Sequence, residues 1–215
     1  MIADHWPLFG LRLLTPRLEL RVPDHDDLGA LADLAAAGIH DPQRQPFVAA
    51  WTDGPPEQVA RSVLQWQWHQ WSRWSPEGWE LAFVVVADGR VIGTQSVGGN
   101  RFAALREVGT GSWLGRGDQG RGYGTEMRAA VLELAFDGLG AVYATSEAFA
   151  DNEASYRVSR KLGYADNGVE RHLVRDRPAL GRRLRLDRAA WLAHRTVPVT
   201  VTGLAPCLPM FGLPA

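Results

Sequence analysis

The sequence is poor in cysteine and in lysine. Its 215 residues include one cysteine, Cys207, so an intrachain disulfide or a cysteine-based zinc site cannot form. We therefore expect a reducing, cytoplasmic setting. Lys161 is the single lysine among 23 basic residues. The arginines suit bidentate binding of phosphate and carboxylate, although genome composition can produce the same bias.

Long apolar runs are also missing. No stretch approaches the roughly 20 apolar residues that cross a bilayer. The N-terminal segment MIADHWPLFG lacks the basic and apolar regions of a signal peptide. The formal net charge of −1 gives no overall attraction to nucleic acid or to membranes. We therefore expect no membrane partner, no direct nucleic-acid partner and no metal.

Hydrophobic periodicity predicts one mixed α/β domain. Capping residues, first-turn prolines and terminal glycines predict helices at 24–37 and 55–74, from a glycine-rich loop to Phe136, and at 152–162. Asp88-Gly89 predicts a hairpin. Strands are predicted at 17–22, 80–87, 90–97, 107–114, 141–149, 169–174, 183–186 and 195–202. The order is a strand, two helices, an antiparallel meander and then β-α-β-α-β.

The segment DQGRGYGTE, residues 118–126, places glycines between a predicted strand and a predicted helix. Glycines let backbone N–H groups approach a phosphate, and the helix dipole favours negative charge there. A P-loop is excluded because no Gly-Lys-Ser/Thr ending follows. A dinucleotide fingerprint needs one more residue between its glycines, although Glu147 ends the next strand as a ribose-binding acid would. A helix entry without a ligand is the third alternative.

Two blocks of residues resemble the GCN5-related N-acyltransferases, the GNAT superfamily. Gln119-Gly-Arg-Gly-Tyr-Gly124 is similar to the family's Q/R-x-x-G-x-G/A motif. A later helical motif, N-x-x-A/S-x-x-L-Y-x-K-x-G-F, is matched by Asn152, Ser155, Val158, Lys161, Gly163 and Tyr164. Thr15–Leu20 resembles the T-x-R-L-x-L start of the RimJ/RimL-like branch, and the resemblance covers about residues 12–190.

This resemblance implies a fold and a domain division. The fold is a single α/β (α+β) GNAT-type domain at residues 1–194. Its mixed, mostly antiparallel sheet has splayed central strands and flanking helices. Residues 195–215 would form a strand-like C-terminal extension that serves packing or oligomer contact.

The resemblance also implies acyl-coenzyme A as co-substrate. Loop N–H groups would hold the diphosphate, and Asn152 would bond the pantetheine arm or simply cap its helix. A backbone N–H near Leu114 would stabilise the oxyanion of the tetrahedral intermediate. The expected cofactor residues are Trp113, Leu114, Gln119, Gly120, Arg121, Gly122, Tyr123, Gly124, Thr125, Asn152 and Ser155.

The catalytic residues are less clearly marked. Many family members carry tyrosine seven residues after the asparagine, as the donor to the departing thiolate, and Ser159 stands there in this sequence. Its hydroxyl can hydrogen-bond a developing thiolate, or it can be a helix residue that faces solvent. Glu107 and Glu147 are candidate bases on the splayed strands, or plain surface groups. The branch's usual glutamate position falls at Gly109.

Residues 66–79 hold five of the nine tryptophans. At about 100° per residue they surround much of the predicted helix, more than one core-facing stripe requires. The helix is therefore buried or in an oligomer contact, or it forms an aromatic wall at the acceptor site. In the second case, the substrate-binding residues would be Trp71, Trp74, His69 and Arg73.

The two ends of the sequence carry similar apolar pentads, Pro7–Leu11 and Pro209–Leu213. They indicate a shared packing site, and we expect a homo-oligomer with a dimer favoured. His5-Trp-Pro-Leu-Phe and His194-Arg-Thr-Val resemble a bacterial subgroup that uses succinyl-CoA. The donor is therefore acetyl-CoA or succinyl-CoA, with succinyl-CoA favoured.

The predicted function is transfer of an acyl group from acyl-CoA to a primary amine. The amine would belong to a small molecule, a protein N-terminus or a lysine, and it would attack the thioester directly in a ternary complex. A non-catalytic CoA-sensing or interaction protein with the same fold is the alternative. A dinucleotide-binding enzyme is a further alternative.

Overall fold

A mixed sheet organises the chain. The computed structural model describes residues 1–214 and arranges nine strands in the order β7-β8-β6-β5-β4-β3-β2-β1-β9. All neighbours pair antiparallel except β5 and β6, which are parallel. The strands are β1 (Arg12–Leu14), β2 (Glu19–Arg21), β3 (Gly78–Ala87), β4 (Arg90–Asn100), β5 (Glu107–Leu114), β6 (Tyr143–Phe149), β7 (Ala165–Val174), β8 (Arg177–Asp187) and β9 (Thr200–Thr202).

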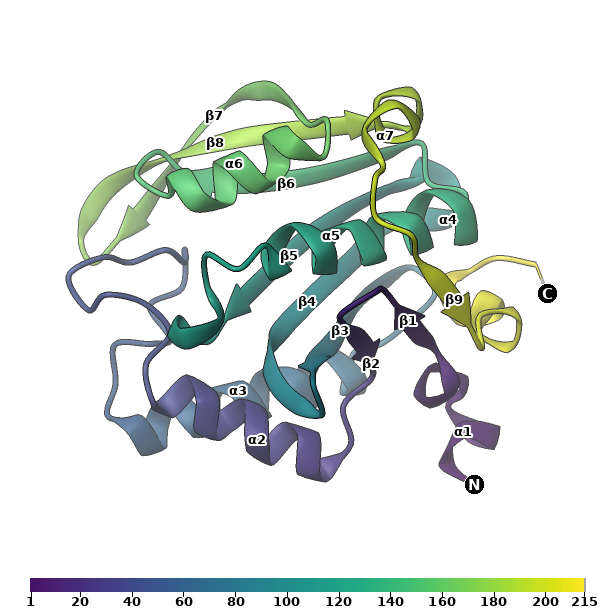
Figure 1. Ribbon diagram of the computed structural model, residues 1–215, viewed down its shortest axis with the longest axis horizontal. Coiled ribbons are helices and arrows are strands. Elements are labelled where there is room, and N and C mark those ends of the chain that lie inside the picture. The colour runs from purple at the N-terminus through teal and green to yellow at the C-terminus, as the bar shows by residue number, and fades with distance from the viewer. Residues whose placement is uncertain (215) are drawn as a thin grey trace.

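Helices cover both faces of this sheet. Figure 1 shows α5 (Tyr123–Glu133) crossing in front of β4 and β5, and α6 (Glu153–Lys161) in front of β6 and β8. The opposite face packs against α2 (His25–Ala36) and α3 (Pro56–Ser72). Shorter elements are α1 (Ile2–His5), η1 (Pro7–Gly10), α4 (Phe102–Leu105), η2 (Arg116–Asp118), η3 (Leu134–Gly138), α7 (Arg188–His194) and η4 (Ala205–Phe211).

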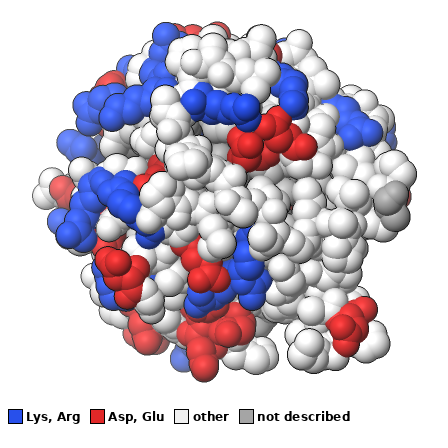
Figure 2. All heavy atoms as spheres, turned by 45° about the vertical axis from the view of Figure 1, so that its right-hand side comes forward, with Lys and Arg blue, Asp and Glu red and all other residues white. Residues whose placement is uncertain are grey.

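Charged groups of both signs share the surface. Figure 2 shows small clusters of acidic and of basic side chains interleaved on one face of the molecule. The formal net charge is −1. The face shown therefore carries no broad field of one sign. Within residues 1–214, no helix has both the length and the apolar character needed to cross a membrane.

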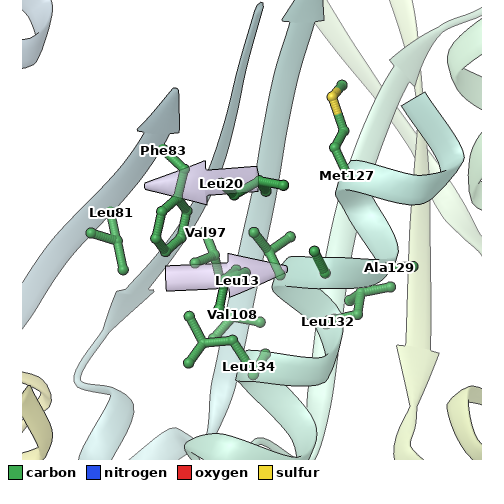
Figure 3. Packing of buried hydrophobic residues seen from close by; sticks show 14 of the residues in the cluster. Leu13, Leu20, Leu81, Phe83, Val97, Val108, Met127, Ala129, Leu132 and Leu134 are labelled. Atoms are coloured by element: carbon green, nitrogen blue, oxygen red, sulfur yellow. The ribbon is translucent and has the colours of Figure 1, made fainter. Parts of the chain in front are cut away.

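The main core lies between the sheet and α5. Alternating residues of β3, among them Leu81 and Phe83, point to this side with Val97 of β4 and Val108 of β5. Figure 3 shows these side chains together with Leu13 and Leu20, and α5 contributes Met127, Ala129 and Leu132 to the same cluster. Each such buried apolar side chain contributes about 1.5–3 kcal/mol. A smaller cluster on the other face joins α2 and α3 to the sheet.

The predicted fold class is confirmed: the chain forms a single mixed, mostly antiparallel sheet flanked by helices. The predicted helix cap at Asp24 and the predicted hairpin at Asp88-Gly89 are also present. Asp24 caps α2, since its carboxylate accepts from Asp27 N at 2.8 Å. Asp88 and Gly89 have φ angles of 49° and 73° and join β3 to β4.

Several predicted strand limits were wrong. The strand expected at 17–22 is β2, which is limited to Glu19–Arg21, and β1 at Arg12–Leu14, which pairs with it, was not predicted. β7 and β8 are longer than expected, and Arg175 and Asp176 join them in a tight turn at φ angles of 48° and 58° without glycine. The strand expected at 195–202 is limited to β9, which begins after Pro198.

The C-terminal segment packs within the same chain. β9 pairs antiparallel with β1, and Figure 1 shows the two strands side by side. Cys207 and Phe211 are fully buried, and Met210 O accepts a hydrogen bond from Trp74 Nε1 at 2.9 Å. The N-terminal and C-terminal pentads both contribute leucines to the main core. Their shared packing site is therefore intramolecular.

Candidate active site

The central strands β5 and β6 part after a short stretch of pairing. Their register ends at Gly109 and Thr145. Beyond this point β5 pairs only with β4, and β6 only with β8. The inner edges of both strands, from Thr110 and Ser146 onward, are therefore open to an extended ligand that pairs like an extra strand. This is the predicted splay.

The glycine-rich loop leads from this gap into α5. Gly120 and Gly122 have φ angles of 75° and 86°, a region that favours glycine. The backbone N–H groups of residues 120–124 have no hydrogen-bond acceptor among residues 1–214. Gly122 is the N-cap of α5 and offers no side chain to satisfy them. Free N–H groups at a helix N-terminus form an anion site.

Side chains around the loop hold its shape. Gln119 Nε2 donates to the carbonyls of Ile39 at 2.8 Å and Leu114 at 2.9 Å. Arg17 pairs with Glu126 and stacks over Tyr123, with 4.6 Å from its Cζ to the ring centroid. Gln119 and Tyr123 therefore support the loop, whereas its glycines leave backbone N–H groups free.

Arg121 and Thr125 differ in what they leave available. The Arg121 guanidinium lies 3.5 Å from Asp118 and is otherwise exposed, so it can reach a phosphate. Arg90 holds the pKa of Asp118 below its usual range, which keeps that carboxyl charged. The Thr125 N–H already donates to Gly122 O at 3.1 Å.

Residues of α6 border the same gap. Asn152 caps the helix, since its Oδ1 accepts from Ser155 N at 3.2 Å. The alternative that Ser159 faces solvent is wrong, because Ser159 is 0% exposed. Its Oγ accepts from Arg128 Nη1 at 2.9 Å and donates to Ser155 O at 3.3 Å.

Arg128 is a feature that the sequence patterns did not predict. This α5 residue is 4% exposed, and burial lowers its pKa. Its guanidinium donates to the hydroxyls of Ser112 at 3.3 Å, Ser146 at 3.1 Å and Ser159 at 2.9 Å. A charged residue inside the buried run MRAAVL was the available signal.

A large cavity opens on the opposite face of the sheet, beside α3. Its volume is about 780 Å³. His69 and Arg73, two of the four expected substrate-binding residues, line it. The other lining residues are Gln70, Ser75, Glu77, Gly78, Trp79, Glu80, Gly98, Gly99, Asn100, Leu105, Glu107, Val108, Gly109 and Thr145.

The tryptophans expected at this site pack elsewhere. Trp71 contacts Phe9 with ring centroids 5.6 Å apart, and Trp74 stacks on Trp79 at 5.9 Å. Both belong to the packing around the main core. Trp113 of β5 likewise lies 5.9 Å from Trp51. These three tryptophans therefore pack against other aromatic rings and do not line the large cavity.

Glu107 and Glu147 border a smaller cavity of about 300 Å³. Glu107 lines both cavities, and Arg185 Nη2 lies 3.2 Å from its carboxylate. Glu147 lines the smaller one and is hydrogen-bonded to the His172 ring. Glu147, Glu170 and His172 also bring three potential metal-ligand atoms within 4.8 Å of one another. Of the two predicted bases, the structure therefore places Glu107 nearer the large cavity.

Glu80 is a third carboxylate, and the sequence patterns missed it. It pairs in register with Gly98 of β4 and fills the space that a side chain there would need. Burial raises its pKa, and the Ser96 hydroxyl partly offsets this effect. Glu80 lines the large cavity. The available signal was a lone acid at the start of the buried strand ELAFVVVA.

Fold and site together define a class: an α/β protein whose parted central strands meet a glycine-rich helix entry with free backbone N–H groups. Residues 17–165 match the family model described as the acetyltransferase (GNAT) domain. The match spans more than half of the chain. The chain belongs to the GNAT acetyltransferase domain family.

Solved structures of similar fold agree with this assignment. Mycobacterium smegmatis RimJ, in complex with a CoA disulfide, is 18% identical, with a TM-score of 0.70 over 85% of this chain and 90% of that one. RimL, a ribosomal L7/L12 alpha-N-protein acetyltransferase in complex with coenzyme A, is 17% identical, with a TM-score of 0.64 over 82% and 97%. A Brucella melitensis GCN5-related N-acetyltransferase is 20% identical, with a TM-score of 0.65 over 85% and 80%.

Proposed function

We propose that this protein transfers an acyl group from acyl-coenzyme A to a primary amine. The observation that carries the proposal is the open gap between β5 and β6, which ends at the free N–H groups of the glycine-rich loop. Family membership supports it. Coenzyme A in the similar RimJ and RimL structures supports the choice of donor.

The donor would occupy the gap and the helix entry together. The N–H groups of residues 120–124 would bind the diphosphate, and Arg121 would add a positive charge. The pantetheine arm would pair with the open edges of β5 and β6. This places the thioester where the strands meet, beside Gly109 and Thr145, and within reach of both cavities.

The amine would enter through the large cavity. Its nitrogen attacks the thioester carbonyl carbon, a C–N bond forms, and the C–S bond breaks with its electron pair moving to sulfur. The attacking amine also gives up a proton. We propose Glu80 as the acceptor of that proton, because burial moves its pKa towards neutral pH. Glu107 is the second candidate.

The acceptor class follows from the cavity and from one neighbour. Glu77, Glu80 and Glu107 give the cavity an acidic lining that suits an amine. RimL is an alpha-N-protein acetyltransferase, so we propose a protein N-terminus as the first acceptor to test, ahead of lysine and small amines. We propose that the active unit is a homodimer, which sedimentation of the full chain at several concentrations tests.

Acetyl-CoA and succinyl-CoA differ in the charge at the end of the acyl group. A succinyl carboxylate would need a cation, and Arg73 lines the large cavity. If succinyl-CoA is the donor, Arg73→Gln should lower its kcat/KM about tenfold or more, since a charge-assisted hydrogen bond is worth at least about 1.5 kcal/mol. Use of acetyl-CoA should be unchanged. Equal losses with both donors would exclude a role for Arg73 in carboxylate recognition.

Thiol release tests the proposal directly. The wild-type protein is incubated with acetyl-CoA or succinyl-CoA and a panel of N-terminal peptides, lysine peptides and small amines. We expect amine-dependent thiol release together with an acylated amine of matching mass. CoA binding without turnover on any amine would favour the non-catalytic alternative. Binding of a dinucleotide in place of CoA would contradict both.

A further inference from the structure

Arg128 carries a buried positive charge without a buried negative one. Its guanidinium is held only by serine hydroxyls, and no carboxylate forms an ion pair with it among residues 1–214. Burial of a charge without a counter-charge costs several kcal/mol. Arginine nevertheless remains protonated in proteins. The fold therefore tolerates an unfavourable group at this place.

This place is the inner end of the gap. Ser112 comes from β5, Ser146 from β6 and Ser159 from α6, so the guanidinium touches all three elements that surround the opening. Ser146 also lines the smaller cavity, which meets the large one at Gly109 and Thr145. The Ser146 hydroxyl thus lies between the Arg128 guanidinium and the smaller cavity.

The hydrogen bonds around Arg128 leave the serine hydroxyl protons, and not the guanidinium-bound lone pairs, available to a ligand. Each serine oxygen accepts from the guanidinium, so its own proton points away from the cation. Ser159 directs its proton to Ser155 O, at a weak 3.3 Å. The buried Arg128 Nε has no partner among residues 1–214. A buried donor on a cation needs an acceptor, and an anion would supply one.

We propose that Arg128, acting through the Ser159 hydroxyl, forms a buried anion site that receives the sulfur of coenzyme A as a thiolate. The inference rests on the proposed function. When the C–S bond breaks, the electron pair goes to sulfur, and the Ser159 proton turns from Ser155 O to the sulfur as a hydrogen bond. The amine proton goes to the carboxylate across the sheet, and solvent protonates the thiolate on release. Arg128 is a positioning residue in this step.

The pH dependence of CoA binding measures this site apart from turnover. A nearby cation lowers the pKa of a bound thiol, so binding releases a proton and affinity rises with pH up to the ordinary thiol pKa. For the wild-type protein, we expect CoA affinity to rise about tenfold for each unit by which binding lowers the pKa of the thiol. Desulfo-CoA, which lacks the thiol, should show no such rise. It carries the same phosphates and is therefore the matched control.

Variants then assign the effect to its residues. Arg128→Met removes the charge at similar length and should abolish the pH-dependent gain, while desulfo-CoA affinity stays within about twofold. Arg128→Lys should restore part of the gain. Ser159→Ala should reduce it, because the hydroxyl that carries the effect is missing. It also serves as the second variant if Arg128→Met does not fold.

The other titratable groups around the guanidinium would not produce a rise of CoA affinity with pH. The elements packed on Arg128 present Ser112, Ser146 and Ser159, which stay neutral, and Tyr164. Burial raises the pKa of Tyr164, so its phenol also stays neutral across the experiment. An Arg128→Met protein that keeps the full pH-dependent gain would overturn the inference.

The outcomes also separate this inference from the proposed function. Failure of desulfo-CoA to bind the wild-type protein would overturn the proposed function itself. Binding of desulfo-CoA with a flat CoA profile would overturn only the thiolate site. If Arg128→Met instead weakens succinyl-CoA selectively and leaves the CoA profile intact, the guanidinium binds the acyl carboxylate, and the thiolate assignment is wrong.

Discussion

The two faces of the sheet at the gap carry opposite chemistry. The α5 and α6 face holds a buried guanidinium, Arg128, surrounded by hydroxyls. The α3 face holds an open cavity with Glu80 and Glu107 in its wall. Acyl transfer from a thioester to an amine needs negative charge stabilised on sulfur and a proton removed from nitrogen. The sheet separates these two tasks, so the cation and the base do not neutralise each other.

The largest loss is expected on the carboxylate face. Glu80→Gln should lower kcat by about 10²–10⁴-fold, because general base catalysis contributes that much. Donor affinity should be unchanged. Since burial raises the pKa of Glu80, wild-type kcat/KM should fall as pH drops through that raised pKa, and the variant should lose this acidic limb.

Glu107→Gln provides the comparison for that experiment. Glu107 lines the same cavity but already pairs with Arg185. If Glu80 is the base, Glu107→Gln keeps the acidic limb of the pH profile. If only Glu107→Gln removes that limb, the base is Glu107 and the assignment of Glu80 is wrong.

The next largest effect is expected in the glycine loop, on which both faces depend for the donor. Gly124→Asp should weaken CoA binding by at least about 100-fold, because like charges placed together cost several kcal/mol. A Cβ at Gly124 would lie 3.6 Å from Val158 Cγ2, an ordinary van der Waals distance, so the backbone accepts a Cβ there.

Gly29→Asp is the matched control for Gly124→Asp. It adds the same charge at an exposed position of α2 with open space around it. Calorimetry with CoA should show wild-type affinity for this control. CoA affinity of Gly124→Asp near the wild-type value would contradict diphosphate binding at the loop.

A smaller effect is expected at the cation face. Ser159→Ala should lower kcat about tenfold or more, since a hydrogen bond to a charged group is worth at least about 1.5 kcal/mol, while the donor KM stays constant. Ser62→Ala is the control, because its Oγ also bonds the carbonyl four residues earlier, at 2.9 Å, but on α3 and exposed. Unchanged turnover would remove Ser159 from the mechanism.

The smallest effect separates the two roles of Asn152. Asn152→Asp keeps the oxygen that caps α6 but loses the amide donor. Thermal stability should be unchanged, and CoA affinity should fall about fivefold, the value of one neutral hydrogen bond of about 1 kcal/mol. Asn152→Ala should lose stability as well. Unaltered CoA affinity in Asn152→Asp would leave Asn152 as a cap alone.

Features with local causes were predictable from the sequence. The Asp24 cap, the Asp88-Gly89 hairpin and the glycine-rich helix entry each depend on residues that are close in the chain. The period of apolar residues was sufficient to place most strands and helices. The two motifs then indicated the family that the comparison shows.

Features that depend on distant contacts were not predictable in this way. Glu80 is a candidate base because Gly98, on the next strand, leaves space for it. Arg128 meets serines that lie 16–31 residues away in sequence. Trp71 and Trp74 pack against segments from both ends of the chain, which periodicity alone does not place.

The central claim is that donor and amine occupy opposite faces of one gap at the same time. Initial rates measured while both substrates are varied test it most directly. A ternary complex with direct attack predicts double-reciprocal lines that intersect. Parallel lines, the signature of a covalent acyl-enzyme, would contradict the account, because the acyl group would then leave CoA before the amine binds.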